Sequence, residues 1–157
     1  GFFLNDEMDD FSVKPGVPNM YGAVGGEANA IKAGKRMLSS MTPTLVLKDG
    51  KPYIVVGTPG GTTIPTQIFQ TLVNILEFNM STEDAVYKPK FHHQWLPDEV
   101  MIEKGFPASV KEAMQKMGYS FSRERGGIGR TECVRVLPNG KFEAVADNRG
   151  DDAAEGY

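Results

Sequence analysis

The sequence has 157 residues, which is the usual size of one folded domain. It carries 17 Lys and Arg against 20 Asp and Glu, so the formal net charge is -3 and there is no basic field to attract a nucleic-acid backbone or an anionic membrane. With 40% hydrophobic residues the chain can bury a core, and its one cysteine, Cys133, cannot close an intramolecular disulfide. We expect Cys133 to be a small buried residue of a strand rather than a reactive thiol.

The first part of the chain combines an apolar start with a long, turn-rich loop. Residues 1–5 are predicted to form a strand that leads into an acidic cluster, Asp6-Glu7-Met8-Asp9-Asp10. If the cluster continues the strand, Asp6 and Asp10 face one way and Glu7 faces the other. The residues up to Gly26 hold too many Pro and Gly for regular structure, and a loop of this length is typical of a functional lid or of a disordered stretch. Because the chain starts at Gly1 inside this apolar run, we interpret it as a fragment or a processed subunit.

The middle of the chain shows the pattern of strand, glycine loop and helix. Residues 44–47 and 52–56 are predicted to form a β-hairpin around the turn Asp49-Gly50. The second strand ends at Gly57-Thr58-Pro59-Gly60-Gly61, and apolar residues then recur at helical spacing from Ile64 to Asn79. Ser81 is predicted to cap a short second helix.

The last part of the chain continues the mixture of strands and helices. Residues 99–103 and 119–123 are predicted to be strands, and residues 107–117 an amphipathic helix that ends at Gly118. Residues 132–137 and 141–146 are predicted to form a hairpin around Pro138-Asn139-Gly140. The fold class is therefore α/β or α+β with a largely antiparallel sheet, and the whole chain, 1–157, is treated as a single unit.

The glycine loop is the strongest candidate for a functional site. A helix N-terminus offers unpaired N–H groups, and glycine lets a ligand approach the backbone. The loop matches neither the dinucleotide fingerprint nor a phosphate-binding P-loop, but the N–H groups of Gly60 and Gly61 could form an oxyanion hole for acyl transfer. The same pattern also fits a purely structural role, as a tight turn where a helix packs on a sheet.

The remaining polar motifs carry weaker signals. The acidic cluster lacks the alternation and central glycine of a calcium loop, so it is either a solvated charge run or a grip for a cationic group. Ser39 and Ser40 follow basic residues and could meet a carboxylate, but neither lies in a nucleophile elbow. His92 and His93 are expected to pack or hydrogen-bond, because neighbouring side chains of an extended segment cannot easily share one metal ion.

Five motifs follow one another as they do in γ-glutamyltranspeptidases, and the similarity runs through essentially the whole chain. The chain therefore resembles the C-terminal part of the small, catalytic subunit of that family. The motifs are Asn5-Asp6-Glu7-Met8-Asp9-Asp10-Phe11, Pro18-Asn19-Met20-Tyr21-Gly22, Lys35-Arg36-Met37-Leu38-Ser39-Ser40-Met41-Thr42-Pro43-Thr44, Gly57-Thr58-Pro59-Gly60-Gly61 and Phe91-His92-His93-Gln94-Trp95-Leu96-Pro97-Asp98-Glu99.

The resemblance implies the αββα sandwich of the N-terminal-nucleophile hydrolases and a precursor that cleaves itself. In that family the new N-terminal threonine of the small subunit attacks the γ-glutamyl amide of glutathione, and the acyl group passes to water, an amino acid or a peptide. The implied partners are glutathione or other γ-glutamyl compounds, the large subunit and the remainder of the small subunit. We expect no cofactor, no metal and no nucleic-acid partner. The resemblance implies a periplasmic, secreted or outer-surface location, and for the isolated chain we expect inactivity and exposed apolar edges that favour oligomers.

Residue roles follow from the same resemblance. Glu7 and Asp10 are expected to bind the α-amino group of the glutamyl moiety. Ser39 and Ser40 are expected to bind its α-carboxylate. The N–H groups of Gly60 and Gly61 are expected to form the oxyanion hole, and residues 12–26 are expected to form a lid with Tyr21 as its gating side chain.

The chain also departs from the family pattern. Asp6 replaces a frequent asparagine, Met37 a frequent proline, and Thr62-Thr63 a frequent Ser-Arg, which leaves the reaction type intact but blurs the acceptor preference. Every threonine of the chain is internal, so the nucleophile is expected to lie outside it. The alternatives are a non-catalytic amino-acid or γ-glutamyl binding module, and a related acylase that cleaves β-lactam side chains.

Overall fold

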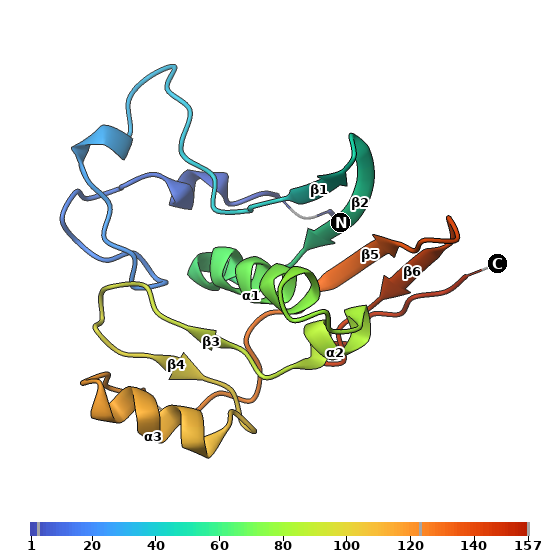
Figure 1. The fold of residues 1–157 in the computed structure, drawn as a ribbon. Helices are drawn as coiled ribbons and strands as arrows, with labels where there is room; N and C mark the ends of the chain where they lie inside the picture. Colours follow the sequence, from blue (N-terminus) through green and yellow to red (C-terminus); the bar gives the residue numbers. More distant parts are fainter. Residues whose placement is uncertain (3, 123, 157) are drawn as a thin grey trace.

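The computed structural model describes residues 1–2, 4–122 and 124–156, and Figure 1 shows their arrangement. A four-stranded antiparallel sheet has the order β1-β2-β5-β6, and β3 and β4 form a separate two-stranded antiparallel sheet. The strands are β1 (Thr44–Lys48), β2 (Lys51–Gly57), β3 (Phe91–His92), β4 (Met101–Ile102), β5 (Glu132–Val136) and β6 (Phe142–Val145). The helices are α1 (Ile64–Leu76), α2 (Thr82–Tyr87) and α3 (Ala108–Lys116), with short 3-10 helices η1 (Glu7–Asp10), η2 (Glu27–Asn29) and η3 (Gly61–Thr63).

The predicted hairpins and helices are confirmed with small shifts of their ends. The turn between β1 and β2 places Asp49 and Gly50 at φ 53° and 73°, the left-handed region that a tight hairpin turn requires. Ser81 caps α2, because its side chain accepts a hydrogen bond of 3.0 Å from the Asp84 backbone N–H. Helix α1 ends at Leu76 rather than at Asn79.

The core lies between one face of the sheet and the helices α1 and α2. Ile54 and Val56 of β2 are buried against the apolar side of α1, together with Cys133 of β5. Burial raises the pKa of the Cys133 thiol to about 11, so it stays protonated near neutral pH. This confirms the prediction of a small buried residue rather than a reactive thiol.

The opposite face of the same sheet carries a row of exposed apolar side chains. Leu45 pairs with Val55, Val55 with Val134, and Val134 with Ala144, so the row crosses all four strands. Leu45, Val55 and Val134 are all exposed. Within the described residues, this face has no second layer packed on it, whereas the first face is covered by helices.

Three expectations about strands were wrong. Residues 1, 2, 4 and 5 form no strand, and Phe2 and Leu4 are 85% and 83% exposed, because a strand needs a hydrogen-bonded neighbour and none of the described residues pairs with them. The acidic cluster curls into the 3-10 helix η1, so its side chains do not alternate as in a strand. Of the strand predicted over residues 119–123, Phe121 makes only an isolated bridge to Val100, and residue 123 lies outside the described residues.

In residues 1–2, 4–122 and 124–156 no helix combines the length and the apolar character needed to cross a bilayer.

Candidate active site around the glycine loop

The glycine loop has the backbone geometry that its sequence suggests. Gly60 has φ 150° and Gly61 has φ 56°, conformations that side chains with a Cβ rarely adopt. The loop passes directly into η3 and then α1, whose first turn accommodates Pro65 because the N–H groups there have no helical partner. Within the described residues, the N–H groups of Gly60 and Gly61 donate to no protein acceptor, so they are available to a ligand.

A buried glutamine supports the loop from beneath. Gln67 of α1 is fully buried, donates through Nε2 to Thr63 Oγ1 over 2.6 Å and accepts from Thr58 Oγ1 over 2.9 Å. A Cβ on Gly60 would lie 2.6 Å from Gln67 Nε2, and a Cβ on Gly129 would overlap the same amide group. Gln67 was not predicted from the sequence, although a polar residue on the apolar side of a predicted helix was the available signal.

The loop predicted as a lid, residues 12–26, is ordered and closed at its base. The N–H of Ser12 donates to Asn29 O over 3.0 Å, and Gly16 N donates to Gly25 O over 2.8 Å. Gly25 packs against Ser12 so closely that a Cβ there would lie 2.0 Å from Ser12 Oγ. Residues 12–26 therefore form an ordered loop rather than a disordered stretch. Their role as a lid stays a prediction.

The tip of this loop rests on the glycine loop. Asn19 Oδ1 accepts hydrogen bonds from the N–H groups of Tyr21 and Ala23 over 2.9 and 3.0 Å, which folds the tip into a tight turn. The Tyr21 ring lies so close to Gly61 that a Cβ there would be 2.8 Å from Tyr21 Cδ1. The structure thus places the predicted gating side chain directly on one of the two predicted oxyanion-hole residues.

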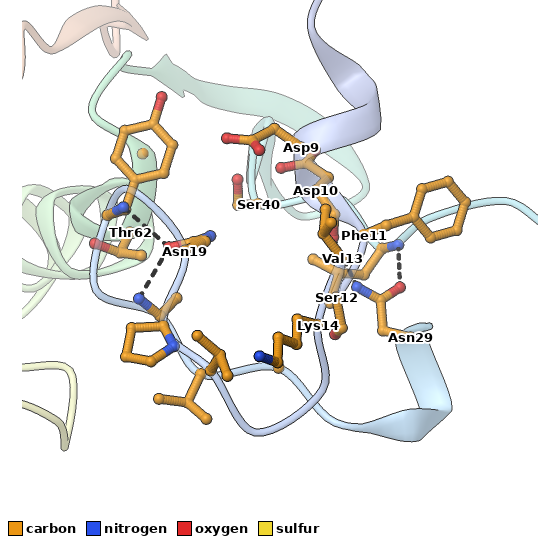
Figure 2. A pocket seen from close by; sticks show the side chains of 18 residues that line it. Asp9, Asp10, Phe11, Ser12, Val13, Lys14, Asn19, Asn29, Ser40 and Thr62 are labelled. Carbon is orange, nitrogen blue, oxygen red and sulfur yellow. Dashed lines mark hydrogen bonds between the residues drawn. The ribbon is translucent and has the colours of Figure 1, made fainter. Parts of the chain in front are cut away.

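A cavity of about 480 Å³ opens between the lid, the acidic cluster and the glycine loop (Figure 2). Asp10, Tyr21, Ser40 and Gly61 all line it, although they come from four separate segments of the chain. In Figure 2, Asp9, Asp10 and Ser40 lie close together on one wall, and Asn19 and Thr62 lie on the other side. Carboxylates beside a hydroxyl suit an ammonium group and a carboxylate held close together, as in an α-amino acid.

Three of the predicted site residues do not line this cavity. Glu7 lies on η1, with its N–H donating to Asn5 Oδ1 over 3.2 Å. The Ser39 hydroxyl accepts from Met41 N over 3.4 Å, so it is engaged with its own segment. Gly60 lies one residue before the lining residue Gly61. The roles assigned to Glu7, Ser39 and Gly60 stay predictions.

A side chain that the sequence analysis did not single out joins the two expected substrate-binding segments. Asn29 donates through Nδ2 to Asp10 O over 2.7 Å and accepts through Oδ1 from Leu38 N over 3.2 Å. It therefore fixes the acidic cluster relative to the segment that carries Ser39 and Ser40. Asn29 and Asp10 are 19 residues apart, a separation at which no sequence pattern indicates a contact.

Both histidines make hydrogen bonds, as expected. His92 is buried and bonds to Thr66 Oγ1 through Nδ1 over 2.8 Å, and His93 Nε2 lies 3.0 Å from an Asp98 carboxylate oxygen. The two rings thus have different partners. In residues 1–2, 4–122 and 124–156 no group of three or more His, Cys, Asp or Glu side chains is placed to hold a metal ion.

Three buried charged residues, Lys90, Glu103 and Asp147, form a cluster with the partly buried Arg149, and this cluster holds residues 126–129, which lie behind the glycine loop. The Glu103 carboxylate accepts from Arg149 Nε and Nη2 over 2.7 Å each, and also from the N–H groups of Lys90 and Ile128. Burial, followed by the repulsion of the Arg149 guanidinium, lowers the pKa of Lys90 to about 8. Because Ile128 precedes Gly129, the cluster fixes the segment that packs on Gln67.

Comparisons with known proteins agree with the resemblance seen in the motifs. A family model described as Gamma-glutamyltranspeptidase matches residues 1–157. The chain is 46% identical over 158 residues to the glutathione hydrolase proenzyme of Escherichia coli (strain K12), a match that covers 100% of this chain and 27% of that protein. The chain thus spans about a quarter of the length of that curated relative.

Solved structures give the same picture of the fold. A crystal structure of a mutant Helicobacter pylori γ-glutamyltranspeptidase superposes with a TM-score of 0.90 at 52% identity, covering 96% of this chain and 82% of that chain. The cephalosporin acylase of Bacillus halodurans superposes with a TM-score of 0.71 at 25% identity, covering 82% of this chain and 25% of that chain. The mixed α/β fold class is confirmed as that of these N-terminal-nucleophile hydrolases.

Proposed function

Because the chain belongs to the γ-glutamyltranspeptidase family, we propose that it forms the oxyanion hole and most of the glutamyl-binding site of an enzyme that transfers or hydrolyses γ-glutamyl groups. The observation that carries this proposal is the cavity, where Asp10, Ser40, Tyr21 and Gly61 meet from four segments. The nucleophile is an N-terminal threonine that lies outside these 157 residues. Its hydroxyl oxygen attacks the γ-carbonyl carbon, the amine leaves with a proton, and water or an acceptor amine then takes the acyl group.

Each predicted site residue has a place in this reaction, including Glu7, Ser39 and Gly60, which lie next to the cavity lining rather than in it. Asp10 and Glu7 hold the α-amino group of the donor, which is a cation near neutral pH. Ser39 and Ser40 donate hydrogen bonds to its α-carboxylate. The free N–H groups of Gly60 and Gly61 stabilise the oxyanion as it forms, which is the step in which backbone donors lower the barrier most. Glutathione is the proposed donor, since the E. coli relative is named for its hydrolysis.

The proposed partners within the protein are the large subunit and the remainder of the small subunit of one precursor. The row of exposed apolar residues across the sheet, Leu45, Val55 and Val134, supports this, because apolar side chains gathered on one sheet face favour burial under a second layer. In the proposed αββα sandwich that layer is the second sheet. We also propose a periplasmic, secreted or outer-surface location, which is supported by the family resemblance alone.

The similarity to a cephalosporin acylase supports one competing substrate class. An acylase for β-lactam side chains that carry no α-amino group needs no grip on one, whereas the present cavity places Asp9 and Asp10 in its wall. A binding module without catalysis keeps the same grip but turns over no substrate. Substrates that differ only in the α-amino group separate these possibilities.

The test uses the full-length precursor that contains this chain, assayed for chromophore release from γ-glutamyl anilide and from glutaryl anilide. We expect turnover of the first and at least about 100-fold lower kcat/KM for the second, since a donor without an α-amino group covers the cavity carboxylate but leaves it without its hydrogen-bonding partner. The variant Asp10→Asn should raise KM for γ-glutamyl anilide by about tenfold or more. The matched control Asp49→Asn changes the same group in the exposed hairpin turn and should leave the kinetics unchanged.

Equal turnover of the two anilides would overturn the γ-glutamyl assignment in favour of an acylase. Tight binding of γ-glutamyl compounds without turnover, in a precursor whose mass shows cleavage ahead of an N-terminal threonine, would favour the binding module. An unchanged KM in Asp10→Asn would show that Asp10 does not bind the donor.

A further inference from the structure

The lid tip, residues 19–23, contacts the rest of the structure through the Tyr21 ring on Gly61 and through a hydrogen bond from the Gln94 side chain. The hydrogen bonds of residues 19–23 are internal to the turn: Asn19 N donates to Ala23 O, Gly22 N to Asn19 O, and Asn19 Oδ1 accepts from two further N–H groups. Gln94 Nε2 donates to Tyr21 O over 3.1 Å, across 73 residues of sequence. In the part of the chain that the structure describes, this is the one hydrogen bond that leaves the lid tip.

The orientation of the Gln94 amide is fixed by its surroundings. Its Nε2 faces two carbonyl oxygens, Tyr21 O at 3.1 Å and Leu96 O at 3.0 Å, and carbonyl oxygens can only accept. Its Oε1 therefore points the other way, where it accepts from Thr62 Oγ1 over 2.7 Å. A flipped amide would set oxygen against two oxygens, so the assignment follows from the network.

The other side of Gln94 connects it to the start of α1. His92 Nε2 lies 2.9 Å from Gln94 Oε1, so this nitrogen carries a proton and donates. The ring is buried and its Nδ1 contacts Thr66 Oγ1 in the first turns of α1. Gln94 thus meets the lid, the turn after the glycine loop and, through His92, the helix that carries Gln67.

We propose that Gln94 is a positioning residue that holds the lid closed, with the Tyr21 ring against Gly61. The neighbouring lid residue Gly22 leaves room for it: a Cβ on Gly22 would lie 3.2 Å from Gln94 Nε2, and its φ of 77° favours glycine in any case. Breaking the single bond to Tyr21 O frees the tip without disturbing the sheet. The kinetic consequence of this inference rests on the proposed function, but the contact itself does not.

The test compares Gln94→Glu with wild type in the full-length protein that contains this chain. The substitution keeps the shape of the side chain but replaces both N–H donors with a carboxylate oxygen that repels Tyr21 O and Leu96 O. We expect hydrogen exchange of the Tyr21, Gly22 and Ala23 amides to become about 5- to 10-fold faster, in line with the loss of one hydrogen bond. Amides of β2 and α1 should keep their protection, which separates lid opening from unfolding.

The matched control is Gln115→Glu, the same chemical change on the exposed surface of α3, which should alter no lid amide. Thr62→Val removes one donor to Gln94 Oε1 and should give a smaller increase in lid exchange, and Thr62→Ser should restore protection. With γ-glutamyl anilide, Gln94→Glu should raise KM about 5- to 10-fold and change kcat less, because a loosened lid weakens retention of the donor.

Lid exchange in Gln94→Glu that equals that of Gln115→Glu would overturn the proposal. A wild-type protein without activity on γ-glutamyl anilide would overturn the proposed function, and the exchange result would still decide the role of Gln94. An active protein in which Gln94→Glu lowers kcat and leaves KM and lid exchange unchanged would also contradict a positioning role at the lid.

Discussion

Replacing Glu103 by glutamine tests whether the buried charge cluster stabilises the region behind the glycine loop. Glu103 is 3% exposed, and its carboxylate accepts four hydrogen bonds, two from Arg149 and two from backbone N–H groups. The glutamine amide keeps one acceptor oxygen, and its NH2 group replaces the other oxygen and faces the two N–H donors that this oxygen accepted from. Two donors therefore lose their acceptor, and Lys90 and Arg149 keep only Asp147 as a counter-charge.

The expected loss of stability follows from these contacts. Breaking a buried ion pair by removing one partner costs about 3–5 kcal/mol. For a protein of this size each kcal/mol lowers the melting temperature by about 2–4 °C, so Glu103→Gln should lower it by roughly 6–20 °C. Amides of residues 126–129 should lose protection first, because Ile128 N is one of the orphaned donors.

Thermal and urea denaturation, followed by circular dichroism, measure the effect. The matched control is Glu112→Gln on the exposed surface of α3, for which the expected change is within about 0.5 kcal/mol. If Glu103→Gln is no less stable than Glu112→Gln, the four hydrogen bonds make no net contribution and the reasoning from buried pairing fails.

The remaining predictions concern pH, the glycine loop and the site wall. Burial lowers the pKa of Lys90 to about 8 from 10.5, so above pH 8 the unfolded state binds more protons and stability rises with pH, by up to about 1.4 kcal/mol to pH 9. Above pH 9 the raised pKa of Cys133, about 11, opposes this rise in stability. Urea titrations at pH 7.5–9 measure the rise, and Lys90→Met should abolish it. Gly60→Ala should lower the free energy of unfolding by about 1–3 kcal/mol and kcat/KM by about 100-fold, because Gly60 has a φ of 150° and its Cβ position is crowded. Gly26→Ala should change neither quantity, because there is open space around Gly26. Asn29→Leu should raise KM for γ-glutamyl anilide about tenfold with kcat little changed, and an unchanged KM would show that this side chain does not set the spacing of the site.

Local patterns predicted the elements that depend on nearby residues. The β1–β2 hairpin forms because Asp49-Gly50 accepts the left-handed backbone of a tight turn, and α1 forms because its apolar residues recur on one side. Gly60 and Gly61 were identified for the same reason, since a glycine pair between a strand and a helix indicates a special backbone conformation. All these signals act within a few residues.

Elements that depend on distant partners could not be predicted in this way. Residues 1–5 have the composition of a strand, but pairing requires a neighbour, and the described residues supply none. The contact of Tyr21 with Gly61 and the hydrogen bond from Gln94 to Tyr21 O join segments about 40 and 73 residues apart. Family resemblance predicts Tyr21 as a gate. Gln94 and Asn29 were missed because their amide side chains have no distinctive local pattern, whereas Gln67 could have been found as a polar residue on the apolar side of a predicted helix.

The division between local and distant contacts has a consequence for how the site works. The glycine loop connects β2 and α1, which both pack in the buried core, so the packing that stabilises the sheet also fixes the positions of the loop N–H groups. The lid tip is joined to that core by the packing of the Tyr21 ring on Gly61 and by one hydrogen bond, from Gln94, which contributes about 1 kcal/mol. The lid tip can therefore open at a small fraction of the cost of unfolding, and the backbone of Gly60 and Gly61, the proposed oxyanion hole, keeps its conformation while it does. Under the proposed function, a donor that enters by breaking this bond would meet a preorganised site, and re-forming the bond would place Tyr21 over Gly61 before the acyl group is attacked.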